Sequence, residues 1–257
     1  MDITTIIGMV LGLGAVIGGQ VLEGGHLSAI LQPTAALIVL GGTFGATLIS
    51  FPMDVVLRAF KDAIHAFTPP PNDPEKAIRD IVALTGKARQ NGLISLEQEA
   101  KNFSDPFTRK GINLIADGTE PQTFRESMEV ELGTFEEHIK TSPEFFEAAG
   151  GFAPTIGIIG AVLGLIHVMS NLSDASKLGE GIAVAFVATI YGLMTANIFC
   201  LPIATKLKHQ NKELVKTKLI ILEGFCSLQA GENPRLIEGK LKSFLHGKNE
   251  EKKGAAK

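Results

Sequence analysis

The sequence has few cysteines and little net charge. Cys200 and Cys226 are its only cysteines, and a lone distant pair gives neither a metal-binding spacing nor a disulfide framework, so we expect two reduced, buried thiols. The net charge is only −3, and the basic residues do not cluster with aromatic ones, which argues against nucleic-acid binding. No cofactor or metal ion is expected.

Lysine and arginine are absent before Arg58. The apolar N-terminus therefore lacks the basic segment of a signal peptide, and no small-residue cleavage site precedes a polar mature domain. We expect this segment to be retained.

Asp, Glu, Lys and Arg are missing from four apolar stretches, each long enough to cross a bilayer, which takes about 20 helical residues. Short connections join the first two and the last two, so each pair predicts a membrane hairpin. The expected fold is an all-α membrane protein with four transmembrane helices. The stretches are residues 4–22, 29–51, 152–169 and 181–203.

The domain boundaries follow from these stretches. A helical cytoplasmic domain is expected between the hairpins and cytoplasmic helices after them. The expected segments are a first hairpin at 1–51, the helical domain at 52–147, a second hairpin at 148–203, C-terminal helices at 204–245 and a disordered tail at 246–257.

The positive charges predict the orientation in the membrane. Eleven of the 24 Lys and Arg residues lie between Arg58 and Lys140, and twelve lie between Lys206 and Lys257. Only Lys177 lies in a hairpin loop. By the positive-inside rule, the helical domain and both termini face the cytoplasm.

Helix signals are clear in the cytoplasmic segments. Asp73 and Pro74 predict the start of a helix that ends at Asn91-Gly92, and "LISLEQEA" predicts a short helix after it. At residues 141–143, Thr-Ser-Pro predicts a cap and a new helix that runs into the third span. Leucine and isoleucine at seven-residue intervals from Leu207 predict a long helix after the fourth span, and "GENPRLIEGKLKSFL" predicts a capped terminal helix.

Small residues recur at four-residue intervals in the spans. Such rows let helices approach closely in lipid, and they serve packing either within one subunit or against another subunit. The rows are Gly8 and Gly12, Gly14 and Gly18, Gly41 and Gly45, Gly160 and Gly164, and Ala188, Gly192 and Ala196.

The spans contain no ionised side chain of the kind that marks a transporter or an ion pathway. If ions pass this protein, a partner must supply the carrier. The polar groups that remain include the hydroxyls of Thr155, Thr189 and Tyr191, and a threonine in a helix usually bonds to a carbonyl one turn earlier. Thr189 is the one that could instead bind a partner's acid.

Pro154 and Pro202 lie where membrane helices meet cytoplasmic ones. Each fits as an ordinary helix-start or bend residue. Because a proline frees a backbone carbonyl and creates a bending point, the pair is also placed to couple the membrane to the cytoplasmic helices.

The chain resembles the MotA/PomA flagellar stator family over nearly its whole length. The resemblance rests on "ARQNGLISLEQEA", "GGFAPTIGIIGAVLGLI", "AVAFVATIYGLMTANIFCLPIATKL" and "GENPRLIEGKL", in this order. It implies a bacterial inner-membrane homo-pentamer around a dimer of a MotB/PomB-type partner, which brings an essential aspartate and a peptidoglycan-binding domain. The ring would turn the rotor protein FliG.

The resemblance also implies roles for residues. "APTIGIIGAVLGL" would line the central pore, with its glycines admitting the partner's helix and Pro154 beside the partner's aspartate. Arg89 and Glu97 correspond to the charges that engage FliG. Gln90 and Gln98 replace charged residues of some relatives, so Lys87 and Glu99 are candidate substitutes in that contact.

One position in the third span bears on whether the coupling ion is a proton or sodium. Sodium-driven relatives carry a threonine seven residues after the proline that aligns with Pro154, and here that position is Ala161. A hard cation needs several oxygen ligands, and the third span offers only Thr155, so protons are favoured.

Three rival functions fit the sequence less well. An ExbB/TolQ-like energy-transducing subunit shares the pore principle, but those relatives have three spans. A membrane-embedded enzyme would need clustered His, Asp or Glu, and His65, His138, His167 and His209 are far apart in sequence. A secondary transporter would need broken helices with charge at the midplane, which the sequence lacks. We therefore expect a stator subunit and not an enzyme.

Overall fold

The structure is a computed structural model that describes residues 2–69, 72–170 and 175–254, with only the backbone for 175–177, 180 and 246–254. This part of the chain is helical and contains no strand, which confirms the all-α prediction. Four of its helical segments are long and apolar enough to cross a membrane, as expected: Ile3–Leu22, Leu27–Ser50, Pro121–Ser170 and Gly181–Gln229. Lys177, predicted in the second hairpin loop, is among the residues whose side chains are not described.

Contacts divide the chain into two compact units. The first comprises Met1–Pro70 with Lys140–His209, and the second comprises Pro71–Ile139 with Gln210–Lys257. The domain boundaries predicted from the sequence mark where the chain enters and leaves the membrane. A division by contacts does not test them, so they stay predictions.

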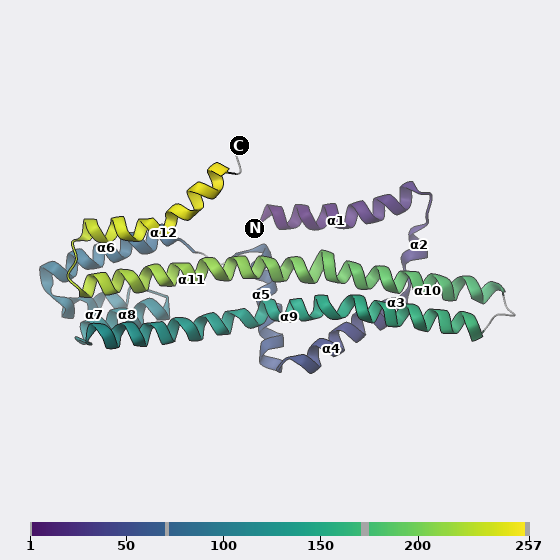
Figure 1. Cartoon of the computed structure of the whole chain (residues 1–257), viewed down its shortest axis with the longest axis horizontal. Helices are drawn as coiled ribbons and strands as arrows, with labels where there is room; N and C mark the ends of the chain where they lie inside the picture. The colour runs from purple at the N-terminus through teal and green to yellow at the C-terminus, as the bar shows by residue number, and fades with distance from the viewer. Residues whose placement is uncertain (1, 70–71, 171–174, 255–257) are drawn as a thin grey trace. The chain divides into compact units, whose positions relative to one another are not determined.

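The first hairpin begins regularly and is then interrupted. Helix α1 (Ile3–Leu22) starts at Asp2, whose carboxylate accepts a hydrogen bond from the Thr4 amide at 3.2 Å. The second predicted span, residues 29–51, is broken before Pro33 because proline has no amide hydrogen to continue a helix. It consists of α2 (Leu27–Ile30), α3 (Pro33–Ala36), a π-helical turn η1 (Leu37–Gly41) and α4 (Gly42–Ser50) (Figure 1).

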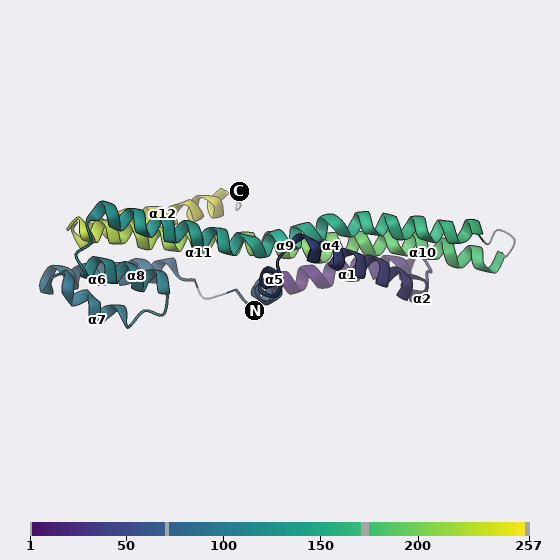
Figure 2. The same cartoon turned by 90° about the horizontal axis from the view of Figure 1, so that it is seen from below.

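The second hairpin is built from two helices that lie side by side (Figure 2). Helix α9 runs over Pro121–Ser170 and α10 over Ala175–Met194. A π-helical turn η3 (Thr195–Cys200) then leads into α11 (Leu201–Gln229), which confirms the predicted helix beyond the fourth span. The widened turn lies directly before Pro202, whose ring removes the regular helical bond to the carbonyl four residues earlier.

The predicted helix restart at residues 141–143 is wrong, because α9 continues through Pro143 without a break. The hydroxyls expected to cap a new helix bind α5 (Met53–Phe67) instead. Ser142 donates to a carboxylate oxygen of Asp62 at 2.6 Å, and Thr141 accepts from Arg58 at 2.7 Å. Tertiary contacts therefore use the side chains that would have ended the helix.

Aromatic side chains attach α5 to the rest of the first unit. Phe60 packs against both Phe145 and Phe146 of α9, with ring centroids 5.7 and 6.4 Å away in edge-on arrangements. Ala204 and Leu207 of α11 are buried in the same cluster. This end of the unit thus has a core of large rings.

The second unit confirms the predicted helix ends. Helix α6 (Pro74–Asn91) starts at Asp73, which accepts from the Lys76 amide at 2.9 Å, and ends at Gly92, whose φ of +82° favours glycine. "LISLEQEA" forms the 3-10 turn η2 (Leu93–Ser95) and α7 (Leu96–Ala100), while α8 (Pro106–Ala116), which we did not delimit from the sequence, is capped by Asp105.

The C-terminal helix α12 (Pro234–Gly254) starts where "GENPRL" predicts and packs along α6. Asn233 caps it by accepting from the Arg235 amide at 3.0 Å. The helix includes the backbone of most of the predicted tail, whereas residues 255–257 lie outside the described part of the chain. The disorder predicted from composition for residues 246–257 stays a prediction.

Both cysteines are free thiols, as expected. They lie in η3 and α11 and are half-buried, so the expected burial is only partial. Neither lies in a group of His, Cys, Asp and Glu that could hold a metal ion within the residues described.

Candidate functional site

Helices α9 and α10 approach through small residues. A Cβ atom added at Gly192 would lie 2.5 Å from the carbonyl oxygen of Ala153, and one added at Gly157 would lie 3.0 Å from that of Ala188. At Gly164 it would lie 2.8 Å from the Ala185 nitrogen. These glycines therefore serve packing within one chain, which was one of the two alternatives left by the sequence.

This packing corrects one implication of the resemblance. Gly157, Gly160 and Gly164, the glycines of "APTIGIIGAVLGL", are buried against neighbouring helices of the same chain. They are not available to admit a partner's helix. The exposed surface of this segment and of the end of α9 that follows it carries large apolar side chains instead, namely Ile158, Ile159, Val162, Leu163, Leu165, Ile166 and Met169.

The candidate hydroxyls in α9 and α10 bond to their own helices. Thr155 is exposed and donates to the Phe152 carbonyl at 2.8 Å, and Thr189 is half-buried and donates to the Ala185 carbonyl at 3.3 Å. Both lie at the level of the hairpin where Gly157 meets Gly192. Ala161, the position that distinguishes sodium-driven relatives, is half-buried two turns beyond Pro154 and adds no oxygen. This level of the hairpin offers few free oxygen ligands.

Tyr191 lies against the break in the second span. Its hydroxyl donates to the Ile30 carbonyl at 2.7 Å and accepts from the Gln32 amide at 3.3 Å. These are backbone groups that the interruption before Pro33 leaves without regular helical partners. The sequence signalled the break through Pro33, but it gave no sign that Tyr191 would satisfy it.

The prolines lie in different settings. Pro154 is half-buried inside the continuous helix α9. Pro202 is exposed and lines a groove of about 390 Å³ together with Gly12 and Lys206. Lys206 pairs with Asp2, and this hydrogen bond, with one from Thr4, holds the pKa of Asp2 below its usual range. The start of the chain is thereby tied to α11 one turn after Pro202.

The corner between α6 and α7 contains the predicted rotor-contact residues. Lys87 and Glu99 bind each other, with Nζ and Oε1 2.7 Å apart, and this bond lowers the pKa of Glu99. Arg89 and Glu97 are exposed and have no ion-pair or hydrogen-bond partner among the described residues. The ion pair between Lys87 and Glu99 fixes the corner, whereas the side chains of Arg89 and Glu97 remain available to bind another protein.

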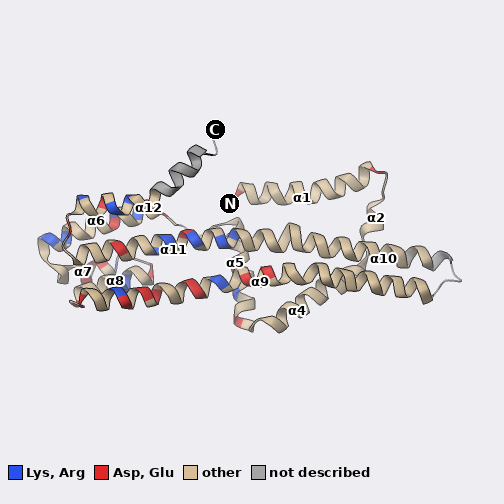
Figure 3. Ribbon diagram, viewed as in Figure 1, with Lys and Arg blue, Asp and Glu red and all other residues tan. Residues whose placement is uncertain are grey.

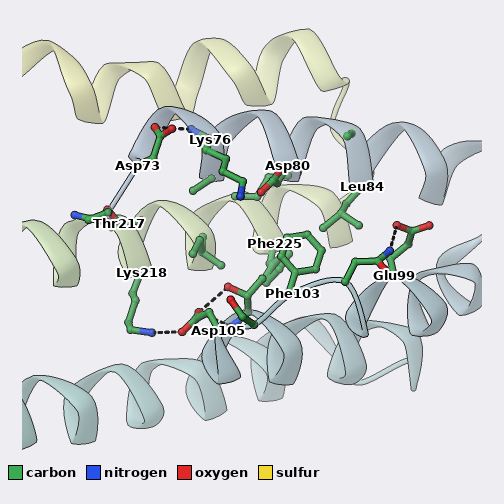
Figure 4. A pocket seen from close by; sticks show the side chains of 18 of the residues that line it. Asp73, Lys76, Asp80, Leu84, Glu99, Phe103, Asp105, Thr217, Lys218 and Phe225 are labelled. Carbon is green, nitrogen blue, oxygen red and sulfur yellow. Dashed lines mark hydrogen bonds and ion pairs between the residues drawn. The ribbon is translucent and has the colours of Figure 1, made fainter. Parts of the chain in front are cut away.

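A cavity of about 630 Å³ lies below this corner, between α6, α8 and α11 (Figure 4). At its floor Lys218 reaches Asp105, with Nζ and Oδ1 2.9 Å apart, and its ammonium lies 4.7 and 4.4 Å from the ring centroids of Phe107 and Phe135. Lys218 is only 9% exposed. Burial raises the pKa of Asp105, but hydrogen bonds from Thr108 and Lys218 outweigh it and lower the pKa overall.

Sequence reasoning missed this buried ion pair. The Asp-Pro step at residues 105–106 was a signal for the start of α8. Nothing in the sequence indicated that Lys218, more than one hundred positions later, would lie beside it.

The distribution of charge separates the candidate spans from the other helices. In Figure 3, α1, α4 and α10 are almost free of coloured charges, whereas α6 and α12 carry both signs, α7 carries acidic residues and α8 carries basic ones.

Two family models match the chain. "MotA/TolQ/ExbB proton channel family" matches residues 99–218, and "Motility protein A N-terminal" matches residues 6–92. Motility protein A of Helicobacter pylori is 33% identical over 95% of both chains. The chain belongs to the MotA/TolQ/ExbB proton channel family.

Solved structures agree with this assignment. The structure of C. jejuni MotAB contains a chain that superimposes with a TM-score of 0.89 at 31% identity, and the match covers 95% of this chain and 96% of that one. A chain of the flagellar MotAB stator complex from Bacillus subtilis has a TM-score of 0.87 at 33% identity, with coverage of 98% and 99%. The chain is therefore of the MotA type, a multi-pass membrane protein of a channel family and not an enzyme, as the sequence predicted.

Proposed function

We propose that this MotA-type chain forms a homo-pentamer around a dimer of a MotB-type partner in the bacterial inner membrane, conducts protons with it and turns the rotor protein FliG. One observation carries the proposal. The chain belongs to a proton channel family, yet its predicted spans contain no Asp, Glu, Lys or Arg. A conduit without a carboxylate, lysine or arginine of its own needs the carboxylate of another chain.

The partner's helix lies, in this proposal, against the exposed apolar side of α9 beyond Pro154. The α10-facing side is closed by the contacts of Gly157 and Gly164. On the exposed side, Thr155 is the polar residue next to Pro154, and its hydroxyl can accept as well as donate. The partner's aspartate would lie at this level.

Protons suit this site better than sodium. Sodium, a hard cation, takes several oxygen ligands, whereas a proton needs one acid and a hydrogen-bond route. At this level of the described hairpin the hydroxyl oxygens are those of Thr155 and Thr189, and Ala161 brings no oxygen, so a sodium ion would find few ligands. The name of the matched family, a proton channel family, supports the same choice.

The driving step is neutralisation of the partner's aspartate. Protonation removes the cost of a charge in a low-dielectric site and lets the ring slip by one subunit. Each elementary charge that crosses a potential of 100 mV releases about 2.3 kcal/mol. Pro154 and Pro202 provide bending points through which the displacement reaches the cytoplasmic helices.

Arg89 and Glu97 transmit the displacement to FliG in this proposal. They are exposed and unpaired among the described residues, in contrast to Lys87 and Glu99, which bind each other. By the positive-inside rule, the basic segments favour a cytoplasmic position for this corner and for both termini, where a rotor can be reached. The full-length likeness to motility protein A chains favours this role over an ExbB/TolQ-like one.

Reconstitution tests the central claim. The chain alone in vesicles is expected to carry neither protons nor sodium, and the chain assembled with its partner is expected to carry protons. Conduction by the chain alone would contradict the proposal. In cells, deletion should abolish swimming, and complementation with the Arg89→Glu and Pro154→Ala variants should restore less than the wild-type chain does.

The ion is tested separately in cells held at a fixed membrane potential. Rotation speed is expected to follow external pH and to be unaffected when sodium is exchanged for potassium. Rotation that follows sodium would overturn the proton assignment and leave the stator assignment intact.

A further inference from the structure

Ile94 lies on the turn η2 between α6 and α7, among the polar residues of the proposed rotor contact. Its side chain is 76% exposed, the largest exposed fraction among the large apolar residues described in the second unit. Leu96, two positions later, is fully buried in the core of that unit. Two apolar side chains therefore lie close together in this turn, and the structure buries Leu96 and leaves Ile94 exposed to solvent.

The turn holds Ile94 in a fixed place. The Ser95 hydroxyl donates to the Gly92 carbonyl at 2.6 Å, and the Ser95 amide donates to the same oxygen at 3.3 Å. Leu96 anchors the turn in the core, and the ion pair between Lys87 and Glu99 ties α6 to α7. A side chain on a rigid turn loses little conformational entropy when it binds.

Polar residues surround Ile94 in the chain. Arg89 and Gln90 lie in the last turn of α6, Glu97 and Gln98 lie in the first turn of α7, and all four are exposed. An apolar side chain inside a rim of polar residues is the usual arrangement of the residues that dominate binding at protein interfaces. Exposed charge pairs alone contribute little, and salt screens them.

We propose that Ile94 is the apolar anchor of the rotor contact. It inserts into an apolar pocket of the rotor protein whose rim carries an acidic side chain facing Arg89 and a basic side chain facing Glu97. The anchor holds the two proteins together during a step, and the charges set the orientation. This inference rests on the proposed function, because it assumes that this corner contacts the rotor.

Site-specific photo-crosslinking in swimming cells tests the contact directly. A benzophenone amino acid is placed at position 94, at position 89 as a reference and at position 236 as a control, since Leu236 is also 61% exposed in the second unit. Crosslinks to the rotor protein are expected from positions 94 and 89 and not from 236. A rotor crosslink from 89 without one from 94 overturns the anchor and leaves the proposed function intact. Absence of rotor crosslinks from both positions refutes the rotor contact itself.

Dwell times on the motor measure the strength of the anchor. Labelled stator complexes carrying Ile94→Ser are expected to leave the motor about tenfold faster or more, at normal membrane levels, as loss of a dominant interface residue would cause. Ile94→Leu should stay within about twofold of wild type, and Leu236→Ser should match it. If Ile94→Ser dwells as long as wild type while Arg89→Glu does not, the charges suffice and the anchor is excluded.

Discussion

The α9–α10 hairpin of the first unit and the core of the second unit are held together by opposite kinds of residue. In the first unit, α9 and α10 meet through glycine and alanine, and at Gly192 and Gly164 a single added methyl group would collide with backbone atoms. In the second unit, the largest fully buried side chains include Phe124, Phe225 and Met128.

The difference reflects the solvent for which each region is built. In water, burial of large apolar side chains is the main stabilising contribution, so the second unit places them inside. In lipid, apolar area gives no drive to associate, so α9 and α10 rely on close backbone contact and leave residues such as Ile158 and Ile166 exposed. Large apolar side chains are therefore buried in the second unit and exposed on the α9–α10 hairpin.

The largest effect is expected from one methyl group at the α9–α10 contact. Gly192→Ala places a Cβ 2.5 Å from the Ala153 carbonyl oxygen, so the helices must separate. We expect a loss of about 2 to 3 kcal/mol of stability, as overpacking typically costs. The midpoint of thermal unfolding in detergent measures it.

Gly14→Ala is the matched control, because a Cβ there has no other described atom within 4 Å. We expect it to be neutral or slightly stabilising, since alanine favours a helix over glycine. Equal losses for the two variants would show that the close contact does not hold the hairpin together.

The next effect concerns the buried charge in the second unit. Asp105→Asn leaves Lys218 buried without its carboxylate, and we expect a loss of about 1 to 2 kcal/mol, less than for a fully buried pair because Asp105 is partly exposed. Lys218→Met should cost less, since the carboxylate it leaves can be hydrated. Chemical unfolding followed by circular dichroism measures both.

Acid should reveal the same pair. The pKa of Asp105 is lowered in the folded state, so its contribution is present above the unfolded pKa of about 3.9 and is lost as the pH falls through the folded value. Stability should therefore fall on acidification below about pH 4, and less steeply in Asp105→Asn. Identical acid profiles for the two proteins would contradict this assignment.

A smaller effect is expected from the polar contact between Tyr191 and the break in the second span. Tyr191→Phe removes the hydroxyl that binds the Ile30 carbonyl and the Gln32 amide, and we expect a loss of about 1 kcal/mol. Ion conduction by the assembled complex should change little if the hydroxyl only stabilises the break. Loss of conduction at unchanged stability would instead assign Tyr191 to the ion pathway.

The smallest effect is expected from exposed charges. Lys110 and Glu131 form an ion pair with Nζ and Oε2 2.6 Å apart, but both side chains are well exposed. A double-mutant cycle with Lys110→Gln and Glu131→Gln should give a coupling of about 0.5 kcal/mol or less. A much larger value would mean that surface charges, and not the apolar core, hold the second unit together.

Local signals predicted many elements of the fold correctly. Proline, the capping residues and uncharged apolar stretches act within a few positions along the chain, so α6, α7, the start of α12 and the spans could be read directly. The failures came from distant contacts. Asp62 and Arg58 bind the hydroxyls that were expected to end a helix at Pro143, and close packing with α10 uses the glycines that were expected to face a partner.

The sequence by itself determined that this chain is helical, crosses the membrane and lacks an ionised group in its spans, because length, hydropathy and charge are properties of single segments. Tertiary structure alone decided which side of α9 is free, where the hydroxyl of Tyr191 is used, and that Arg89 and Glu97 stay unpaired while Lys87 and Glu99 bind each other. Those outcomes depend on which distant side chains become neighbours, and a local pattern does not specify them.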